Sequence, residues 1–174
     1  MFSKKIVGIA ACDPHGIMGK DGKLPWHCAE DLKHFADATR GHPLVMGYQT
    51  FLALPPSYFD RRLAIVFSRR KISPPINPHL IFVSSLADFL ALEQTLPEGC
   101  PLYVIGGAQI YTLFLQENLI AEFILTLLTD AYAGDTLFPL QLLTSWPSIE
   151  VRKTPAFAIR HYFNPRCKYP GETL

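Results

Sequence analysis

The sequence lacks a charge excess of either sign. Its 174 residues include 16 Lys and Arg against 15 Asp and Glu, so the formal net charge is +1. Proteins that bind nucleic acid or an anionic membrane need clustered positive charge, so neither partner is expected. Charged residues make up 18% of the chain and hydrophobic residues 49%. This composition excludes general disorder and is sufficient for the core of one ordinary domain.

Long apolar runs and paired cysteines are missing as well. No uninterrupted apolar stretch approaches the length of a membrane-spanning helix. Residues 4–12 resemble a lipoprotein signal, but the apolar run before Cys12 is too short for a signal core, and a buried first strand is preferred. The four cysteines form no CxxC pair, which is typical of free thiols in a reducing compartment. A cytoplasmic protein is therefore expected.

Several common functional motifs are absent. The sequence contains neither GxGxxG nor GxxxxGK[ST], and it has no GxSxG motif of a serine hydrolase. His27 and Asp31 have the spacing of ligands on a helix, but the other histidines are scattered and no second cluster completes a metal site. No metal is expected.

The chain does contain short apolar runs that alternate with helical patterns. Strands are predicted at 5–11, 44–46, 63–67, 80–83, 102–105 and 122–129, followed by a hairpin at 148–153 and 156–163. Helices are predicted from about 28 to 39, within 49–54, after Ser84-Ser85 and over 108–116. This order indicates an α/β domain: a mostly parallel mixed sheet of about eight strands, an antiparallel C-terminal hairpin and about four flanking helices. Residues 164–174 are predicted to form a loosely held tail.

One acid is notable at the start of the first predicted helix. Asp31 shares a helix face with Cys28 and Phe35, whereas Glu30 points about 100° away. Because burying an unpaired carboxylate is costly, Asp31 must be paired, protonated or functional. Its position alone favours an ordinary first-turn acid that complements the helix dipole. The rigid Pro25-Trp26 and the glycine-flanked segment 16–23, which has the freedom of a mobile loop, favour a functional acid.

Small and basic residues follow the predicted strands at their carboxyl ends, where α/β sheets bind ligands. Gly106-Gly107 suits either a structural turn or a phosphate that approaches a helix N-terminus. Ser68-Arg69 forms either a solvated basic loop or a site for a phosphomonoester. Together with Asp31, these residues suggest an acid that faces a heterocycle beside a phosphorylated cofactor.

A series of short motifs runs through most of the chain in a fixed order: Ile9-Ala10-Ala11, Met18-Gly19, Leu24-Pro25-Trp26, Asp31-Leu32 with Phe35, Met46-Gly47 with Thr50-Phe51, Arg61, Ser68-Arg69, Ile105-Gly106-Gly107 with Tyr111, Thr126, and Gly134-Asp135-Thr136 with Phe138-Pro139. In these motifs the sequence resembles the bacterial dihydrofolate reductases over residues 5–163, so residues 1–163 are expected to form the reductase domain. The resemblance implies an oxidoreductase that uses NADPH to reduce 7,8-dihydrofolate to 5,6,7,8-tetrahydrofolate in one-carbon metabolism. It also implies a monomer that binds antifolate inhibitors.

The resemblance implies a role for each matching residue. Asp31 would bind the 2-amino group and N3 of the pteridine, and Arg61 would pair with the α-carboxylate of the glutamate tail. The residues expected to serve catalysis are Asp31, Leu24, Trp26 and Thr126. The other residues expected to bind substrate are Ile9, Ala10, Leu32, Phe35, Leu54, Arg61, Ile105 and Tyr111. The residues expected to bind the cofactor are Ala11, Met18, Gly47, Tyr48, Gln49, Thr50, Phe67, Ser68, Arg69, Ile105, Gly106, Gly107, Ala108, Gln109, Ile110 and Tyr111. A cis peptide is expected between Gly106 and Gly107.

Two positions depart from the family pattern. Many members carry a basic residue where this chain has Tyr48, and some carry one at Gln109. Arg69 remains as a cation for the adenosine phosphate. The implied preference for NADPH over NADH is therefore smaller than in relatives that also carry a second cation at position 48. Two alternatives remain: another reductase of this fold, such as the pyrimidine reductase of the riboflavin pathway, and a folate- or nucleotide-binding protein without turnover. Asp31 with Trp26 and Arg61 argue against the first, and the sequence leaves the second open.

Overall fold

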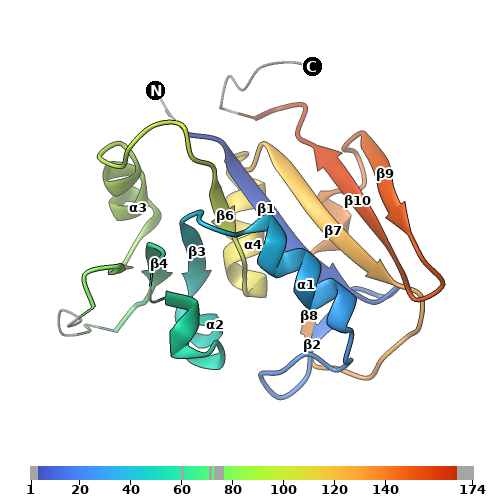
Figure 1. The fold of residues 1–174 in the computed structure, drawn as a ribbon. Coiled ribbons are helices and arrows are strands. Elements are labelled where there is room, and N and C mark those ends of the chain that lie inside the picture. The colour runs from blue at the N-terminus through green and yellow to red at the C-terminus, as the bar shows by residue number, and fades with distance from the viewer. Residues whose placement is uncertain (1–3, 60, 71, 73–76, 168–174) are drawn as a thin grey trace.

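A computed structural model describes residues 4–59, 61–70, 72 and 77–167. Its centre is an eight-stranded sheet with the strand order β5-β4-β3-β6-β1-β7-β10-β9 (Figure 1). The strands from β5 to β7 pair in parallel, and β10 is antiparallel to both of its neighbours. The bounds are β1 (Ile6–Cys12), β3 (Leu44–Gly47), β4 (Ala64–Phe67), β5 (Leu80–Val83), β6 (Leu102–Val104), β7 (Glu122–Leu128), β9 (Ser148–Lys153) and β10 (Phe157–Phe163). The predicted mixed sheet with its antiparallel hairpin is confirmed.

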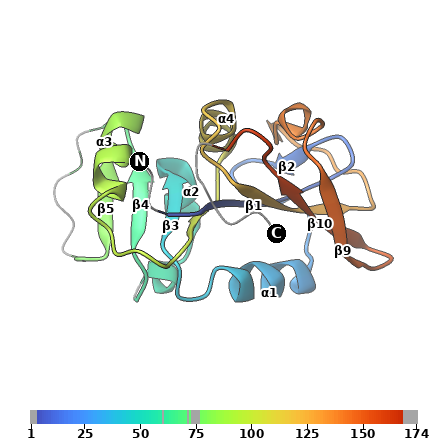
Figure 2. The ribbon, with the colours of Figure 1, turned by 90° about the horizontal axis from the view of Figure 1, so that it is seen from above.

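The four predicted α-helices are also confirmed: α1 (Ala29–Ala38), α2 (Tyr48–Ala53), α3 (Leu86–Glu93) and α4 (Ala108–Gln116). Ser85 caps α3 as its sequence pattern predicts, because its hydroxyl accepts a hydrogen bond from the Asp88 amide at 3.1 Å. Figure 2 shows α1 on one face of the sheet and α3 and α4 on the other. Two short 3₁₀ turns, η1 (Pro56–Phe59) and η2 (Leu140–Leu142), complete the helical elements of the described residues.

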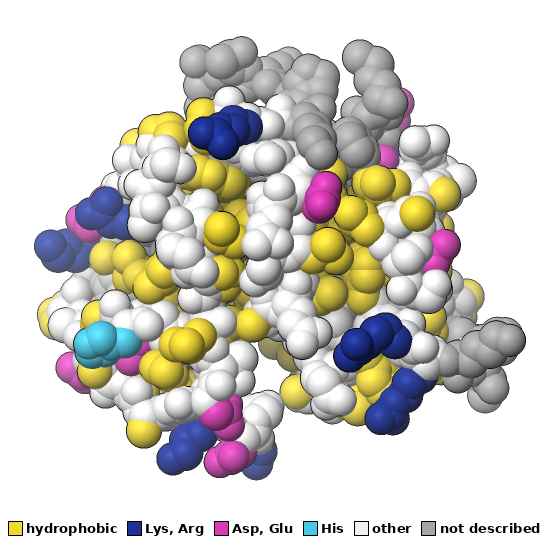
Figure 3. Space-filling view, turned by 180° about the vertical axis from the view of Figure 1, so that it is seen from behind, with side chains coloured by type: hydrophobic (Ala, Val, Ile, Leu, Met, Phe, Trp, Pro, Cys, Tyr) yellow, Lys and Arg dark blue, Asp and Glu magenta, His cyan; other side chains and the backbone are white. Residues whose placement is uncertain are grey.

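A hydrophobic core lies on each face of the sheet. On the α3 and α4 side, Phe89, Phe114 and Phe123 are fully buried, and on the α1 side Trp26 and Ile159 belong to a second cluster. Burying side chains of this size stabilises the fold by about 1.5 to 3 kcal/mol each. Coverage on both faces explains why the parallel strands appear in the sequence as continuous apolar runs. On the side behind the view of Figure 1, basic side chains form separate groups rather than one continuous patch (Figure 3).

Two short strands outside the main sheet differ from the prediction. Residues 17–19, predicted as part of a loop, form β2 (Ile17–Gly19), which pairs antiparallel with β8 (Thr136–Leu137). The prediction of a loop was therefore wrong at these residues. Strands of three and two residues are too short to show an apolar period, and their pairing joins segments far apart in sequence.

The predicted C-terminal tail begins with residues attached to the domain. The Asn164 side-chain amide donates to the Ile120 carbonyl at 2.8 Å, and its backbone amide donates to the Ala121 carbonyl at 3.0 Å. The rest of that prediction, residues 168–174, lies outside the described residues. Across the described part of the chain, no helix is long and apolar enough to cross a membrane.

Candidate active site

Asp31 lies in the first turn of α1 and is only 7% exposed. Thr126, from the middle of β7 and also buried, makes a side-chain hydrogen bond to it. Burial raises the pKa of Asp31, while the Thr126 hydrogen bond and the nearby His34 act in the opposite direction. The predicted functional acid and its supporting threonine are therefore brought together. The carboxyl group is one that can exchange a proton nearer to neutral pH than an exposed aspartate can.

Apolar side chains of α1 and of the segments before and after it lie on the same side of the sheet, and some of them are open to solvent. Trp26 is 8% exposed, and its ring lies 5.4 Å from that of Tyr132. The indole Nε1 is buried, without a hydrogen-bond partner among the described residues. Leu24, on the segment before α1, and Leu32 are largely exposed, and the exposure of Leu32 departs from the apolar helix face predicted around Asp31. Phe35 and Leu54 are half-buried, as is Tyr58, whose ring lies 6.4 Å from that of Phe35. Exposed apolar side chains around a buried acid are typical of a ligand site.

Asp13, which was not predicted as a site residue, fastens two loops beside Trp26. Its fully buried carboxylate accepts hydrogen bonds from the amides of His15 and Ile17, each at 2.8 Å, and from that of Tyr132 at 2.9 Å. Burial alone would raise the pKa of Asp13, but these three backbone donors lower it. An acid three residues before Gly16 is typical of a turn. The hydrogen bond from Tyr132, in the other loop, could not be predicted, because no pattern in the neighbouring residues indicates it.

Backbone groups dominate the carboxyl edge of β3 and β6. The Gly47 amide donates to the Gly106 carbonyl at 2.8 Å, and the predicted cis peptide between Gly106 and Gly107 is confirmed. Gly106 has a φ of +116°, and a Cβ there would lie 3.2 Å from the Tyr111 ring. The Tyr111 hydroxyl donates to the Ile9 carbonyl at 2.6 Å, which ties α4 to β1. No side chain caps α4 after Gly107, so its first amides are available to an anion.

The residues around the glycine edge, which is formed by Gly47, Gly106 and Gly107, differ in how accessible their side chains are to a ligand. Arg69 is exposed, whereas Ser68 is buried and its hydroxyl hydrogen-bonds the backbone of Arg70. The Tyr48 ring stacks on Phe51 with the centroids 6.1 Å apart. Phe67 points away from the edge, since its ring packs between Phe89 and Phe114, 5.7 Å from each. Thr50 lies near Gly107 and Ile110 near Gly47, because a Cβ at these glycines would lie 3.4 Å and 3.2 Å from the two side chains. The remaining predicted residues are exposed (Gln49, Gln109), half-buried (Ala10, Ala11, Met18, Ala108) or buried (Ile105).

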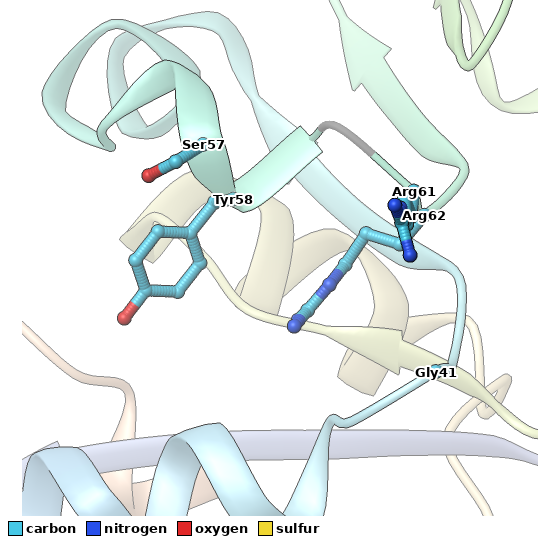
Figure 4. A pocket seen from close by; sticks show the side chains of 5 residues that line it. All are labelled: Gly41, Ser57, Tyr58, Arg61 and Arg62. Atoms are coloured by element: carbon cyan, nitrogen blue, oxygen red, sulfur yellow. The ribbon is translucent and has the colours of Figure 1, made fainter.

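A cavity of about 370 Å³ lies at the other end of α1. It is lined by Gly41, Ser57, Tyr58, Arg61 and Arg62 (Figure 4). The half-buried Arg62 donates from Nη1 to the Thr39 hydroxyl at 3.2 Å, and its guanidinium carbon lies 5.7 Å from the centre of the Tyr58 ring. Arg61, the residue predicted here, is exposed. Arg62 was missed because two adjacent arginines give no sequence signal for which side chain is held in the cavity.

Comparison with known proteins gives consistent matches. A model of the family described as dihydrofolate reductase matches residues 5–163. The dihydrofolate reductase of Bacillus subtilis is 36% identical over 133 residues, which cover 75% of this chain and 73% of the relative. The type 3 dihydrofolate reductase of Salmonella typhimurium is 35% identical over 149 residues, 85% of this chain and 86% of the relative. The protein HdrB of Haloferax volcanii, also a dihydrofolate reductase, is 32% identical over 146 residues, 78% of this chain and 71% of the relative.

A solved structure has the same fold. Dihydrofolate reductase from Enterococcus faecalis, complexed with NADP(H) and RAB-propyl, superposes with a TM-score of 0.76. The match covers 94% of this chain and 98% of that protein, at 23% sequence identity. The sheet order and the flanking helices described above are therefore those of a known enzyme architecture.

Proposed function

We propose that this chain, which belongs to the dihydrofolate reductase family, uses NADPH to reduce 7,8-dihydrofolate to 5,6,7,8-tetrahydrofolate. The observation that carries the proposal is the buried Asp31 carboxyl with its Thr126 partner beside a group of partly exposed apolar side chains. A carboxylate there accepts hydrogen bonds from N3 and the 2-amino group of a pterin, and Leu32, Phe35 and Leu54 contact the ring. The same carboxylate would hold the basic ring of an antifolate inhibitor.

The residues at the glycine edge fit a nicotinamide dinucleotide phosphate. The uncapped first turn of α4 offers amides to a pyrophosphate, and Gly107, where a Cβ would meet only Thr50 Oγ1 at 3.4 Å, leaves room for close approach to the backbone. The exposed guanidinium of Arg69 is available to the adenosine phosphate. When bound, the cofactor supplies the hydride that is transferred to C6 of the pterin. Ala11, Met18 and Tyr111 would then border the nicotinamide.

Protonation of N5 needs a donor, and Asp31 is the ionisable group assigned to the ring. In our proposal Asp31 orients the pterin and stabilises its protonated form, and a water admitted past the loop delivers the proton to N5. Leu24, exposed on the segment before Trp26, would cover the nicotinamide and exclude other water when that loop closes.

The cavity at Arg61 and Arg62 suits the carboxylates of a glutamate tail. We assign the α-carboxylate to this guanidinium pair, with Arg62 as the better oriented member because Thr39 and Tyr58 hold its side chain. A guanidinium fixed in advance loses less side-chain entropy when it binds a carboxylate. Arg61 is left to contribute from the outer edge of the cavity.

Turnover is the direct test. Purified protein is mixed with NADPH and dihydrofolate, and oxidation of NADPH and formation of tetrahydrofolate are followed together, with Asp31→Asn as the matched control. Equimolar NADPH oxidation and tetrahydrofolate formation, largely lost in the variant, are expected. Tight binding of dihydrofolate without turnover would instead identify a binding protein, and turnover only with a pyrimidine substrate would identify another reductase.

Domain extent, assembly and compartment belong to the same proposal. We infer that residues 1–163 form the reductase domain and that the protein acts as a monomer in the cytoplasm. Cys12, Cys28 and Cys100 are free thiols, which suits a reducing compartment. Sedimentation of the purified chain tests the monomer.

A further inference from the structure

The indole ring of Trp26 belongs to the segment that joins two parts of the candidate site. Along the chain it lies two residues after Leu24 and five residues before Asp31, the acid of α1. The ring is 8% exposed, and its Nε1 atom has no hydrogen-bond partner among the described residues. A buried indole usually has such a partner, and the hydrogen bond then helps to fix the ring. In the described part of the chain, the orientation of Trp26 therefore depends on packing.

Tyr132 contacts this ring from a distant segment. The two ring centres lie 5.4 Å apart, and the ring planes are inclined at 56°. Aromatic pairs favour such tilted arrangements at about 4.5 to 7 Å, because the electron-rich face of one ring attracts the hydrogen edge of the other. Both residues belong to the core cluster on the α1 side of the sheet, where Tyr132 is half-buried. The contact therefore opposes rotation of the Trp26 ring.

The loop that carries Tyr132 is otherwise exposed. Residues 130–131 and 133–135 are all exposed, so Tyr132 is the half-buried member of this segment. Its backbone amide donates a hydrogen bond to Oδ2 of Asp13 at 2.9 Å, and Oδ1 of the same carboxylate accepts two amides from its own segment. Asp13 follows β1 directly and is fully buried. This hydrogen bond therefore fixes the backbone at Tyr132 relative to the sheet.

We propose that Tyr132 is a positioning residue for Trp26: its ring, anchored through the loop to Asp13, holds the indole in one orientation. The proposal deepens the proposed function and rests on it, because it assumes that the Trp26 ring serves the reductase reaction. The buried Nε1 is then a hydrogen-bond donor fixed in advance for a polar group in the site. The alternative is an aromatic contact that stabilises the fold and has no effect on turnover.

Two substitutions separate the ring of Tyr132 from its hydroxyl group. Tyr132→Phe keeps the aromatic ring, whereas Tyr132→Leu keeps an apolar side chain and removes the aromatic pair. Loss of such a pair corresponds to roughly a two- to ten-fold change in rate, so kcat should fall by this factor in Tyr132→Leu with little change in KM. Tyr132→Phe should retain the kcat of the wild type. An unchanged kcat in Tyr132→Leu would leave only a structural contact and overturn the proposal.

Tryptophan fluorescence follows the ring itself and does not depend on turnover. The chain has two tryptophans, and Trp146 lies in the core cluster on the other face of the sheet, so Trp146→Phe isolates the emission of Trp26. In this background Tyr132→Leu should increase acrylamide quenching and speed the anisotropy decay, and Tyr132→Phe should change neither. Equal values in all three proteins would overturn the proposal. If Trp146→Phe fails to fold, near-ultraviolet circular dichroism of the two-tryptophan proteins gives the same comparison.

The anchor is tested at Asp13. Asp13→Asn keeps the shape of the side chain but has one acceptor oxygen instead of two, so at least one of the three amide hydrogen bonds is lost. The oxygen that accepts two amides is the more costly one to replace, and the bond from Tyr132 should be lost first. Quenching of Trp26 should then increase as it does in Tyr132→Leu. Unchanged quenching would refute the anchoring role of Asp13.

Tyr103 supplies a matched control. It is also half-buried and makes an aromatic contact, 5.3 Å from the His42 ring, but it lies on β6. Tyr103→Leu should change neither kcat nor the fluorescence of Trp26. An equal loss of kcat in Tyr103→Leu and Tyr132→Leu would mean that any loss of aromatic packing slows turnover, and would refute a specific role. If the wild type does not reduce dihydrofolate but Tyr132→Leu still loosens Trp26, the reductase is rejected and the orienting contact is retained.

Discussion

The two halves of the candidate site differ in which groups form them: side chains in one half and mainly backbone in the other. On the α1 side, buried side chains form the site: Asp31, Thr126 and Trp26 are each less than 10% exposed. At the carboxyl edge of β3 and β6, the site is formed by glycine backbone, the first turn of α4 and the exposed Arg69. In Figure 1, α1 lies in front of the sheet near β1, whereas α2 follows β3 at its carboxyl end. A side-chain site holds one shape and one charge, whereas a backbone site accepts any ligand that brings a phosphate to its amides.

The largest effect is expected from breaking the side-chain half. Asp31→Asn should reduce turnover by a factor of about 10² to 10⁴ while leaving the fold intact, because the amide keeps the shape and loses the charge. Steady-state rates with dihydrofolate and a circular dichroism spectrum measure both. Activity within a few-fold of the wild type at neutral pH would remove Asp31 from its proposed role.

Arg62→Ala should show how far the side-chain half extends. Loss of a charged, hydrogen-bonded contact is expected to weaken dihydrofolate binding by about 2 to 3 kcal/mol, and to leave a pterin without the glutamate tail almost unaffected. Arg61→Ala is the neighbouring control and should cost less, since its side chain is exposed. Calorimetric titration with both ligands distinguishes the two arginines. Equal losses for both ligands would indicate a defect in folding instead.

The backbone half is tested through the exposed Arg69. A single guanidinium contact to the adenosine phosphate is worth about 1.5 to 3 kcal/mol, so NADPH should be preferred over NADH by roughly ten- to a hundred-fold. Arg69→Ala should nearly equalise the two cofactors, mainly through a higher KM for NADPH. If the preference survives this change, another group binds the phosphate.

Substituting Gly106 or Gly107 tests the backbone half of the site through its effect on the stability of the fold. Gly106→Ala places a Cβ at positive φ and 3.2 Å from the Tyr111 ring, and should destabilise the fold by about 1 to 3 kcal/mol. At Gly107 the nearest atom to a Cβ is Thr50 Oγ1 at 3.4 Å, an ordinary contact, so Gly107→Ala should fold normally and weaken only cofactor binding. Urea unfolding and cofactor titration separate the two effects. A normally stable Gly106→Ala would contradict this expectation.

The smallest effect concerns pH and stability. Because burial raises the pKa of Asp31 above its unfolded value, the folded protein binds more protons between these two pKa values, and stability falls as the pH rises through that range. Above it, the ionised and desolvated carboxylate costs stability, so Asp31→Asn should be the more stable protein at neutral pH. The advantage should disappear in acid. Melting temperatures against pH test this, and a variant less stable at neutral pH would reverse the sign.

The sequence predicts one half of the site better than the other. Residues 108–116 were predicted as a helix and form α4 with those bounds, because Gly106-Gly107 and a clear apolar face mark it locally. Asp31 could be identified from the sequence because a carboxylate on an apolar helix face is costly to bury and so needs a partner or a function. Arg62 and the Tyr132 partner of Asp13 depend on contacts between distant segments, and nothing in their neighbouring residues reports them. The inward turn of Phe67 also follows from the packing of α3 and α4 rather than from its strand pattern.

The Asp13 carboxylate has a kinetic consequence. It is bonded at once to the stretch that leads to Leu24 and to the loop that carries Tyr132, and β2 and β8 pair just beyond it. The two hydrogen bonds to His15 and Ile17 hold Asp13 within its own stretch, and the bond from the Tyr132 amide joins the two loops. Either that bond breaks when one loop opens or both loops move as one body. In enzymes whose slow step is the departure of product, such a shared hinge sets the pace of the whole cycle. Turnover could then be altered at residue 13 without changing any atom that touches a ligand.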